Sequence, residues 1–201
     1  MIASRKHLTI VLLIVAALAF VGWYSNARGT QAATPNRMAL YASVVIGQLL
    51  FLRYIKIGIR IPLRELIGDV RWFDPLIAAA LWCAIHFGSP YLRRALQLSD
   101  DRTSNILPHT VAEALAWIVV ACTAGFVEEV VFRGYLQRQV GLALQAIAFG
   151  IAHGYQGVRS VVVIAIIGLA FGLVARFRSS LVPGMLTHAA LDLYALAAST
   201  A

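Results

Sequence analysis

The chain has 201 residues, of which 60% are apolar and only 13% are charged, and its mean hydropathy is +0.78. A soluble domain carries about 25% charged residues, so the composition excludes an ordinary soluble domain. We expect residues 1–201 to form a single integral membrane domain, an all-α polytopic transmembrane bundle of about seven spans, between six and eight. The net charge of +8 does not indicate nucleic acid, because the basic residues lie scattered between apolar runs and form no amphipathic stripe. The expected partner is the lipid bilayer.

Apolar runs separated by polar residues divide the chain into its expected spans. They cover residues 7–24, 38–57, 72–87, 110–137, 139–153, 160–177 and 182–198. Residues 59–70 are predicted to lie along the membrane interface as an amphipathic helix, and residues 88–109 to form a loop outside the membrane. The first span could instead be a signal peptide with a cleavage-like site at residues 31–33. We favour an uncleaved helix.

The distribution of basic residues predicts the orientation in the membrane, because cytoplasmic loops carry an excess of Lys and Arg. If the N-terminus is cytoplasmic, eleven basic residues face the cytoplasm: Arg5, Lys6, Arg53, Lys56, Arg60, Arg64, Arg71, Arg133, Arg138, Arg176 and Arg178. The other six are Arg28, Arg37, Arg93, Arg94, Arg102 and Arg159. We therefore expect a cytoplasmic N-terminus, in a membrane of the bacterial inner-membrane type.

The two cysteines, Cys83 and Cys122, both lie inside apolar segments. They match no metal-binding or disulfide pattern. We expect both to be buried small hydrophobic side chains.

Two adjacent carboxylates and an arginine follow the apolar run that begins at Ala114. Inside a bilayer each such charge costs about 2.5–3.5 kcal/mol, so Glu128, Glu129 and Arg133 must face protein or a water-filled cavity. In an α-helix Glu129 and Arg133 stand at i and i+4 and can pair, while Glu128 points about 100° away. One carboxylate is then held by the arginine, and its neighbour stays available for chemistry.

Two other apolar segments carry polar side chains: His153 ends one, and His188 and Asp192 stand at i and i+4 in the last. If the chain turns near Gly141 between antiparallel helices, Glu128 and His153 lie at similar depth, about 18 Å from the turn. His188 lies on the same side of the membrane. We expect these groups to converge in the cytoplasmic half of the bundle. A purely structural ion network is the alternative.

Such a set suits hydrolysis of an amide. A carboxylate and a histidine on one water can polarise it and take its proton, and a second histidine with a side-chain donor can stabilise the oxyanion. The alternative is a Zn²⁺ site of two histidines and a glutamate, with water in the fourth position. Because the His-Glu-x-x-His pattern is absent, its ligands would have to come from three separate helices.

These residues resemble the motifs of the CAAX-protease and bacteriocin-processing family of intramembrane proteases, which includes the Rce1-type prenyl-protein endopeptidases. The family pattern is Glu-Glu-x-x-x-Arg, then Phe-x-x-x-His, then His-x-x-x-Asn/Asp. Residues 128–133, 149–153 and 188–192 match it in order and spacing. The resemblance covers about residues 110–198, while the N-terminal half matches only in being membrane-spanning. It implies an all-helical membrane fold whose site opens to the membrane and to the cytoplasmic side.

The resemblance also implies roles for the first two motifs. Glu128 would be the general base that activates water, with His153 as its partner, and Glu129 and Arg133 would hold the helix geometry. The family has been called metal-dependent, but its motifs also suit a glutamate-activated water without metal. We favour the second mechanism, which requires no cofactor; Zn²⁺ is the alternative.

In the third motif, the resemblance implies that His188 and Asp192 build the oxyanion site. Asp192 stands where Asn frequently occurs in the family. Because an ionised aspartate cannot donate a hydrogen bond, Asp192 would have to be protonated or would instead orient His188.

We therefore predict an intramembrane endopeptidase that cleaves near the C-terminus or membrane anchor of a membrane-associated protein or peptide. In a bacterium the substrate would be a hydrophobic sorting tail or a secreted peptide precursor rather than a prenylated protein. One alternative is a non-catalytic immunity or scaffold protein of the same fold. Another is a proton- or ion-coupled transporter, disfavoured because no inverted repeat is visible.

Overall fold

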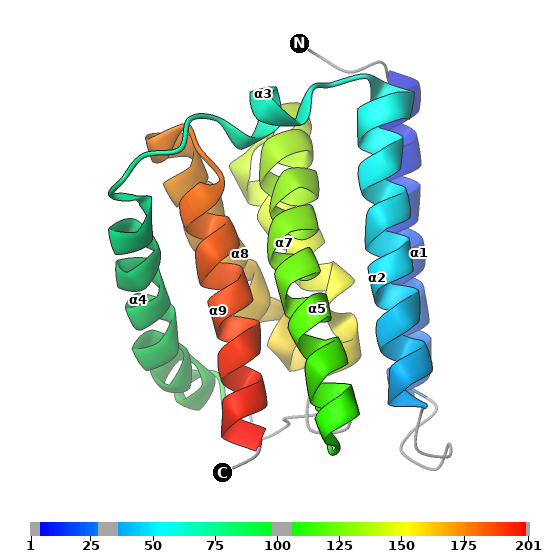
Figure 1. The fold of residues 1–201 in the computed structure, drawn as a ribbon, viewed down its shortest axis with the longest axis vertical. Helices are drawn as coiled ribbons and strands as arrows, with labels where there is room; N and C mark the ends of the chain where they lie inside the picture. Colours follow the sequence, from blue (N-terminus) through cyan, green and yellow to red (C-terminus); the bar gives the residue numbers. More distant parts are fainter. Residues whose placement is uncertain (1–4, 28–35, 98–105, 200–201) are drawn as a thin grey trace.

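The computed structural model describes residues 5–27, 36–97 and 106–199, and the secondary-structure elements of these residues are all helices (Figure 1). They are α1 (Arg5–Ala27), α2 (Arg37–Arg53), π-helical η1 (Tyr54–Ile59), α3 (Leu63–Ile67), α4 (Asp74–Ala95), α5 (Val111–Glu128), π-helical η3 (Glu129–Leu136), α6 (Gln137–Val140), α7 (Leu142–Ala152), 3₁₀-helical η4 (Gly154–Gln156), α8 (Val158–Arg178) and α9 (Val182–Ser199). Within the described ranges the only β-pairing is an isolated bridge between Gly68 and Ser180. The prediction of an all-α fold is confirmed.

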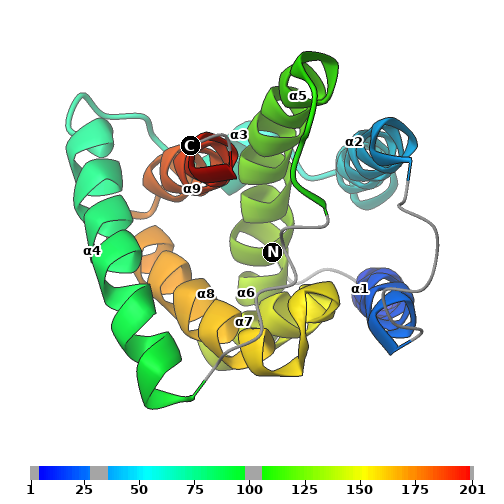
Figure 2. The same cartoon turned by 90° about the horizontal axis from the view of Figure 1, so that it is seen from below.

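Helix α5 runs through the middle of the bundle. It packs against α2 on one side and α9 on the other, while α4 packs on the outer side of α9 and α7 lies against α8 (Figures 1 and 2). The short α3 lies across one end of the bundle, the end at which α1 starts (Figure 1). This packing brings α5, α7 and α9, which carry the three predicted motifs, into one group.

Four described segments are long and apolar enough to cross a membrane. They are Arg37–Ile59, Asp74–Ala95, Val111–Val140 and Ser160–Arg178. Helix α7 is apolar but shorter than these segments. The first and last helices, α1 and α9, complete the bundle in Figure 1.

The start of α5 has a local cause in the sequence. The side chain of Thr110 accepts a hydrogen bond from the backbone N–H of Glu113, and the Glu113 carboxylate accepts one from the N–H of His109. This arrangement is close to a capping box, except that the Glu113 carboxylate accepts from the residue before the N-cap rather than from the N-cap Thr110 itself. It places the helix start close to the predicted residue 110.

Helix α4 continues beyond its predicted end. It includes Pro90 and ends at Ala95, so the first part of the loop predicted at residues 88–109 is helical. Arg93 and Arg94 lie in its last turn, where positive charge is favoured by the helix dipole. Their polarity therefore marks the end of a helix rather than a loop. Residues 98–105 and the cleavage-like residues 31–33 lie outside the described part of the chain.

Two other predictions are corrected. The interfacial helix predicted at 59–70 is reduced to α3 at Leu63–Ile67. Cys83 and Cys122 are exposed, so the prediction that both are buried is wrong. In a membrane bundle the lipid-facing surface is as apolar as the core, and apolar neighbours in the sequence therefore do not imply burial within the protein.

Candidate active site

The junction between α5 and η3 holds the predicted pair of glutamates. Glu128 is the last residue of α5, and the π-helix starts at Glu129 and buries all of Glu129–Leu136. Sequence reasoning treated this stretch as an ordinary α-helix. Wider π-helical turns occur frequently at functional sites, and here the change of helix type falls between the two carboxylates.

Glu129 and Arg133 form a fully buried ion pair. The Nη1 atom of Arg133 donates to Oε1 of Glu129 at 2.8 Å, and both side chains have no exposed surface. Nη2 of Arg133 also donates to the Gly168 carbonyl at 3.3 Å. The guanidinium lies 4.0 Å from the centre of the Phe149 ring and 5.1 Å from that of Phe171, distances that allow cation–π attraction. The pair therefore joins η3, α7 and α8 at a fixed point.

His188 on α9 connects this ion pair to the other glutamate. Its Nδ1 lies 3.2 Å from Oε1 of Glu129, the oxygen that also accepts from Arg133. Its Nε2 lies 3.9 Å from Oε2 of Glu128. Because Glu129 fixes one ring nitrogen, the other is held toward Glu128.

His153 approaches Glu128 from the end of α7. Its Nδ1 donates to the backbone carbonyl of Phe149 at 2.8 Å, so Nε2 is the nitrogen that faces Glu128, 3.6 Å from Oε2. A neutral ring with Nδ1 protonated carries a lone pair on Nε2. It can therefore accept a proton on the side of the carboxylate.

The Oε2 atom of Glu128 lies between the two imidazoles. It is buried and makes no hydrogen bond with any described protein group, whereas buried polar atoms are nearly always bonded. Both histidine nitrogens are farther from it than the 2.7–3.2 Å typical of a direct N–H···O bond. Separations of this size suit one water molecule hydrogen-bonded to all three groups.

Asp192 lies at the edge of this cluster. Its Oδ2 is 3.9 Å from Nε2 of His188, and its side chain is about one third exposed, at 34%. The backbone carbonyl of Asp192 accepts a hydrogen bond from Trp117 Nε1 at 2.9 Å, which ties this turn of α9 to α5. The structure thus brings together all six residues predicted for the site.

Two polar residues near the site were not predicted from the sequence. Gln48 on α2 donates from Nε2 to Oε1 of Glu128 at 3.4 Å, and Gln145 on α7 donates to the Gly168 carbonyl beside Arg133. Each is a lone amide within an apolar stretch, which was the signal available. The N-terminal half of the chain therefore contributes a side chain to the site.

Two glycines allow the close approach of α9. A Cβ on Gly125 would lie 2.9 Å from two backbone atoms of α9, the carbonyl oxygen of Met185 and the nitrogen of Ala189. A Cβ on Gly184 would lie 2.8 Å from Oε2 of Glu129. Both distances are too short for a real contact, so larger residues would move α9 or the glutamate. His188 depends on these glycines for its position.

Glu128 and the two histidines of the site are also the ligands of the alternative Zn²⁺ site. Among the described residues, no group of three or more His, Cys, Asp and Glu side chains is arranged to hold a metal ion. Glu128, His153 and His188, the donor set predicted for Zn²⁺, do not form such a group; the Nε2 atoms of the two histidines lie 3.6 and 3.9 Å from Oε2 of Glu128, separations that a bridging water also spans. The mechanism below therefore passes no step through a metal.

Comparison with known families gives one match. Residues 108–194, somewhat less than half of the chain, match the family of type II CAAX prenyl endopeptidase Rce1-like proteins. The family recognised from the three motifs is thus shown over this segment, which contains Glu128, His153 and His188. Neither the curated proteins nor the solved structures contain a significant match. The apolar helices indicate an integral membrane protein, and the match shows that its residues 108–194 are similar to a protease family.

Proposed function

We propose that this chain, whose residues 108–194 match the Rce1-like family, is an intramembrane endopeptidase. It hydrolyses a peptide bond near the C-terminus or membrane anchor of a membrane-associated protein or peptide. The observation that carries the proposal is the buried Oε2 atom of Glu128, which has no described protein partner and faces two imidazole nitrogens at 3.6 and 3.9 Å.

The first step is attack of water on the scissile carbonyl. A water held between Glu128 and Nε2 of His153 gives its proton to the carboxylate as its oxygen bonds to the carbonyl carbon. His153 orients the water through the lone pair that its bond to the Phe149 carbonyl leaves on Nε2. General base catalysis of this kind contributes about 10²- to 10⁴-fold in rate.

The second requirement is stabilisation of the oxyanion. In its doubly protonated form His188 donates from Nδ1 to Glu129 and keeps its Nε2–H for the negative oxygen. Asp192, in its protonated form, supplies a second donor; ionised, it orients His188 from 3.9 Å. A donor that is already in position costs no reorganisation when the charge develops.

Collapse of the tetrahedral intermediate completes the reaction. The C–N bond breaks, and the proton held by Glu128 passes to the leaving amine. One water is consumed, and a carboxylic acid and an amine are formed, which ionise to a carboxylate and an ammonium group. Glu129 and Arg133 take no part in bond making; they are positioning residues that act through His188 and the helix backbone.

The proposed topology follows from the alternating helix directions. With α3 and the basic residues around it at the cytoplasmic end, α1, α2, α4, α5, α7, α8 and α9 make seven passes in a single membrane domain of residues 1–201, with a cytoplasmic N-terminus. A bacterial inner membrane suits this arrangement. The substrate is then a hydrophobic sorting tail or a secreted peptide precursor.

The experiment that tests the function compares membrane peptides by mass spectrometry in cells with the wild-type chain, with Glu128→Gln and with neither. The proposal predicts fragments with new termini near a hydrophobic anchor, present only with the wild-type chain. A biological effect of the chain that persists undiminished in Glu128→Gln, without such fragments, would favour a non-catalytic immunity or scaffold protein.

A further inference from the structure

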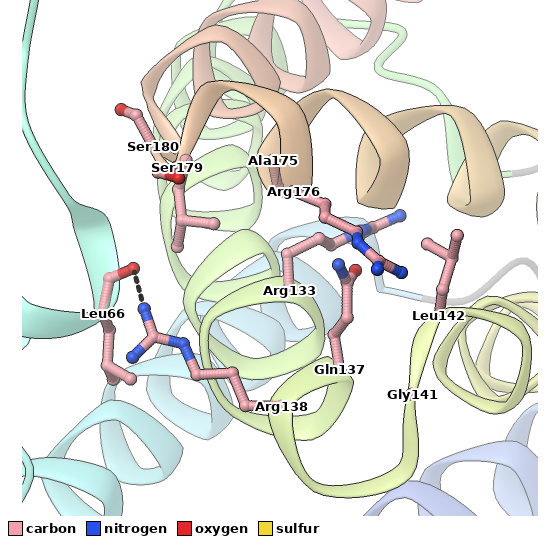
Figure 3. A pocket seen from close by; sticks show the side chains of 11 residues that line it. Leu66, Arg133, Gln137, Arg138, Gly141, Leu142, Ala175, Arg176, Ser179 and Ser180 are labelled. Atoms are coloured by element: carbon pink, nitrogen blue, oxygen red, sulfur yellow. Dashed lines mark hydrogen bonds between the residues drawn. The ribbon is translucent and has the colours of Figure 1, made fainter. Parts of the chain in front are cut away.

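A cavity lies at the α3 end of the bundle, and Glu128 does not belong to its lining. It has a volume of about 360 Å³ and opens between η3 and α6 on one side and α8 on the other (Figure 3). Its lining residues are Leu66, Arg133, Gln137, Arg138, Gly141, Leu142, Ala175, Arg176, Ser179, Ser180 and Leu181. Arg133 is the residue that it shares with the candidate active site.

The lining of this cavity is positively charged. It contains three arginines, and no Asp or Glu belongs to the lining. Arg133 is neutralised by Glu129 behind it, whereas Arg138 donates only to the carbonyls of Glu65 and Leu66. Arg176 is exposed. Two positive charges therefore lack a carboxylate partner among the lining residues.

Nearby Arg178 gives a contrast at the same end of the molecule. Its Nε donates to the buried carboxylate of Asp74 at 2.7 Å, and its Nη2 to the Asp69 carbonyl. Through these contacts Arg178 links the end of α8 to the start of α4, and its charge is paired with a carboxylate. Arg138 and Arg176, by contrast, have no carboxylate partner among the residues that line the cavity.

A ligand that carries both an anionic group and a hydroxyl group would complement the polar side chains that line the cavity. Nε of Arg133 and Oε1 of Gln137 are buried and have no described protein partner. The first is a donor and the second an acceptor. Gln137 is held in place because its Nε2 donates to the Gly172 carbonyl at 3.0 Å. Ser180 accepts from the N–H of Val182, which leaves its hydroxyl proton free to donate.

We propose that this cavity binds a phosphate group, and that an anionic phospholipid with a hydroxylated headgroup presents it. The phosphate meets the guanidinium groups of Arg138 and Arg176, and a headgroup hydroxyl donates to Gln137. Basic cavities between membrane helices at the cytoplasmic side are suited to lipid headgroups. In the topology proposed above, this cavity at the ends of α6 and α8, beside α3, lies at the cytoplasmic end of the bundle, where lipid phosphates would meet it. The inference does not depend on the proposed hydrolysis.

The test is lipid binding by the purified full-length chain, measured by native mass spectrometry during titration with phosphatidylglycerol, with phosphatidylcholine and with inorganic phosphate. Wild-type chain should bind phosphatidylglycerol in preference to phosphatidylcholine. Arg176→Gln should weaken that binding about fivefold, the loss expected for one basic residue near lipid phosphate. Arg176→Lys should retain most of it because the charge remains.

The matched control is Arg64→Gln, which removes an exposed arginine from α3 at the same end of the bundle but outside the cavity lining. It should leave the binding within about twofold of wild type. Equal losses in Arg64→Gln and Arg176→Gln would show diffuse surface attraction and overturn the site. Inorganic phosphate that displaces the lipid at similar concentration would overturn the lipid as the source of the phosphate.

Discussion

The Nδ1 atom of His188 lies 3.2 Å from Oε1 of Glu129, and the same oxygen accepts a hydrogen bond from Arg133. One buried carboxylate oxygen thus joins an ion pair to a histidine of the site. In the proposed mechanism the ion pair therefore positions His188 as well as stabilising the fold, and the first prediction follows from this.

Arg133→Met should destabilise the protein strongly, because it leaves the Glu129 charge buried without its partner. Breaking one side of a buried pair costs about 3–5 kcal/mol. The thermal midpoint in detergent should therefore fall by more in Arg133→Met than in the double variant Glu129→Gln/Arg133→Met, which removes both charges. Arg64→Met is the control at an exposed site. If Arg133→Met melts within about 2 °C of wild type, the pair does not contribute to stability as predicted.

Gly125→Ala should impair cleavage by moving α9. The added Cβ would meet backbone atoms of Met185 and Ala189 at 2.9 Å, and His188 lies between these two residues. We expect cleavage to fall about tenfold, with a loss of stability of about 1–3 kcal/mol from overpacking. The control is Gly47→Ala on α2, where a Cβ meets nothing within 4 Å. If both variants cleave alike, the close approach of α5 and α9 is unimportant.

Asp192→Asn should keep cleavage within about threefold of wild type, whereas Asp192→Ala should lower it about tenfold or more. The reason is that an amide can donate to the oxyanion whatever the pH, and alanine cannot. Initial rates on the same peptide give the comparison. A large loss in Asp192→Asn would instead assign the residue to orienting His188 by its charge.

Removal of metal should leave the cleavage rate unchanged, because in the proposed mechanism Glu128 takes the proton of the water without the help of a metal. The measurement is the rate in the purified chain before and after dialysis against a chelator. A loss that added Zn²⁺ restores would overturn the metal-free mechanism and make Glu128, His153 and His188 the first candidates for ligands.

The residues of the candidate site could be identified from the sequence because they form short local motifs and because charged residues in an apolar segment carry a high free-energy cost. Charged residues in an apolar run must face protein or water, and the turn at Gly141 sets Glu128 and His153 at matching depth. The pairing of Glu129 with Arg133, predicted from i, i+4 spacing, is present at 2.8 Å. The catalytic roles of these residues remain predictions.

Other features depend on packing that the sequence does not reveal. The π-helix at Glu129–Leu136 arises from a change of the backbone hydrogen bonds to the i→i+5 pattern, which the order of apolar and polar residues does not predict. Gln48 reaches Glu128 only because α2 packs on α5. The ion pair between the buried Asp74 and Arg178 joins residues more than a hundred positions apart in the chain, so it likewise depends on tertiary packing.

The most direct test of the account is the initial cleavage rate of Glu128→Gln on the peptide bond identified by mass spectrometry. Glu65→Gln, a change of the same kind at an exposed carboxylate of α3, is the matched control, and both variants should melt close to wild type. We predict that Glu128→Gln loses at least about a hundredfold in rate, because glutamine cannot take the proton of the water, while the control cleaves normally. A folded Glu128→Gln chain that cleaves at the wild-type rate would contradict the glutamate-activated water.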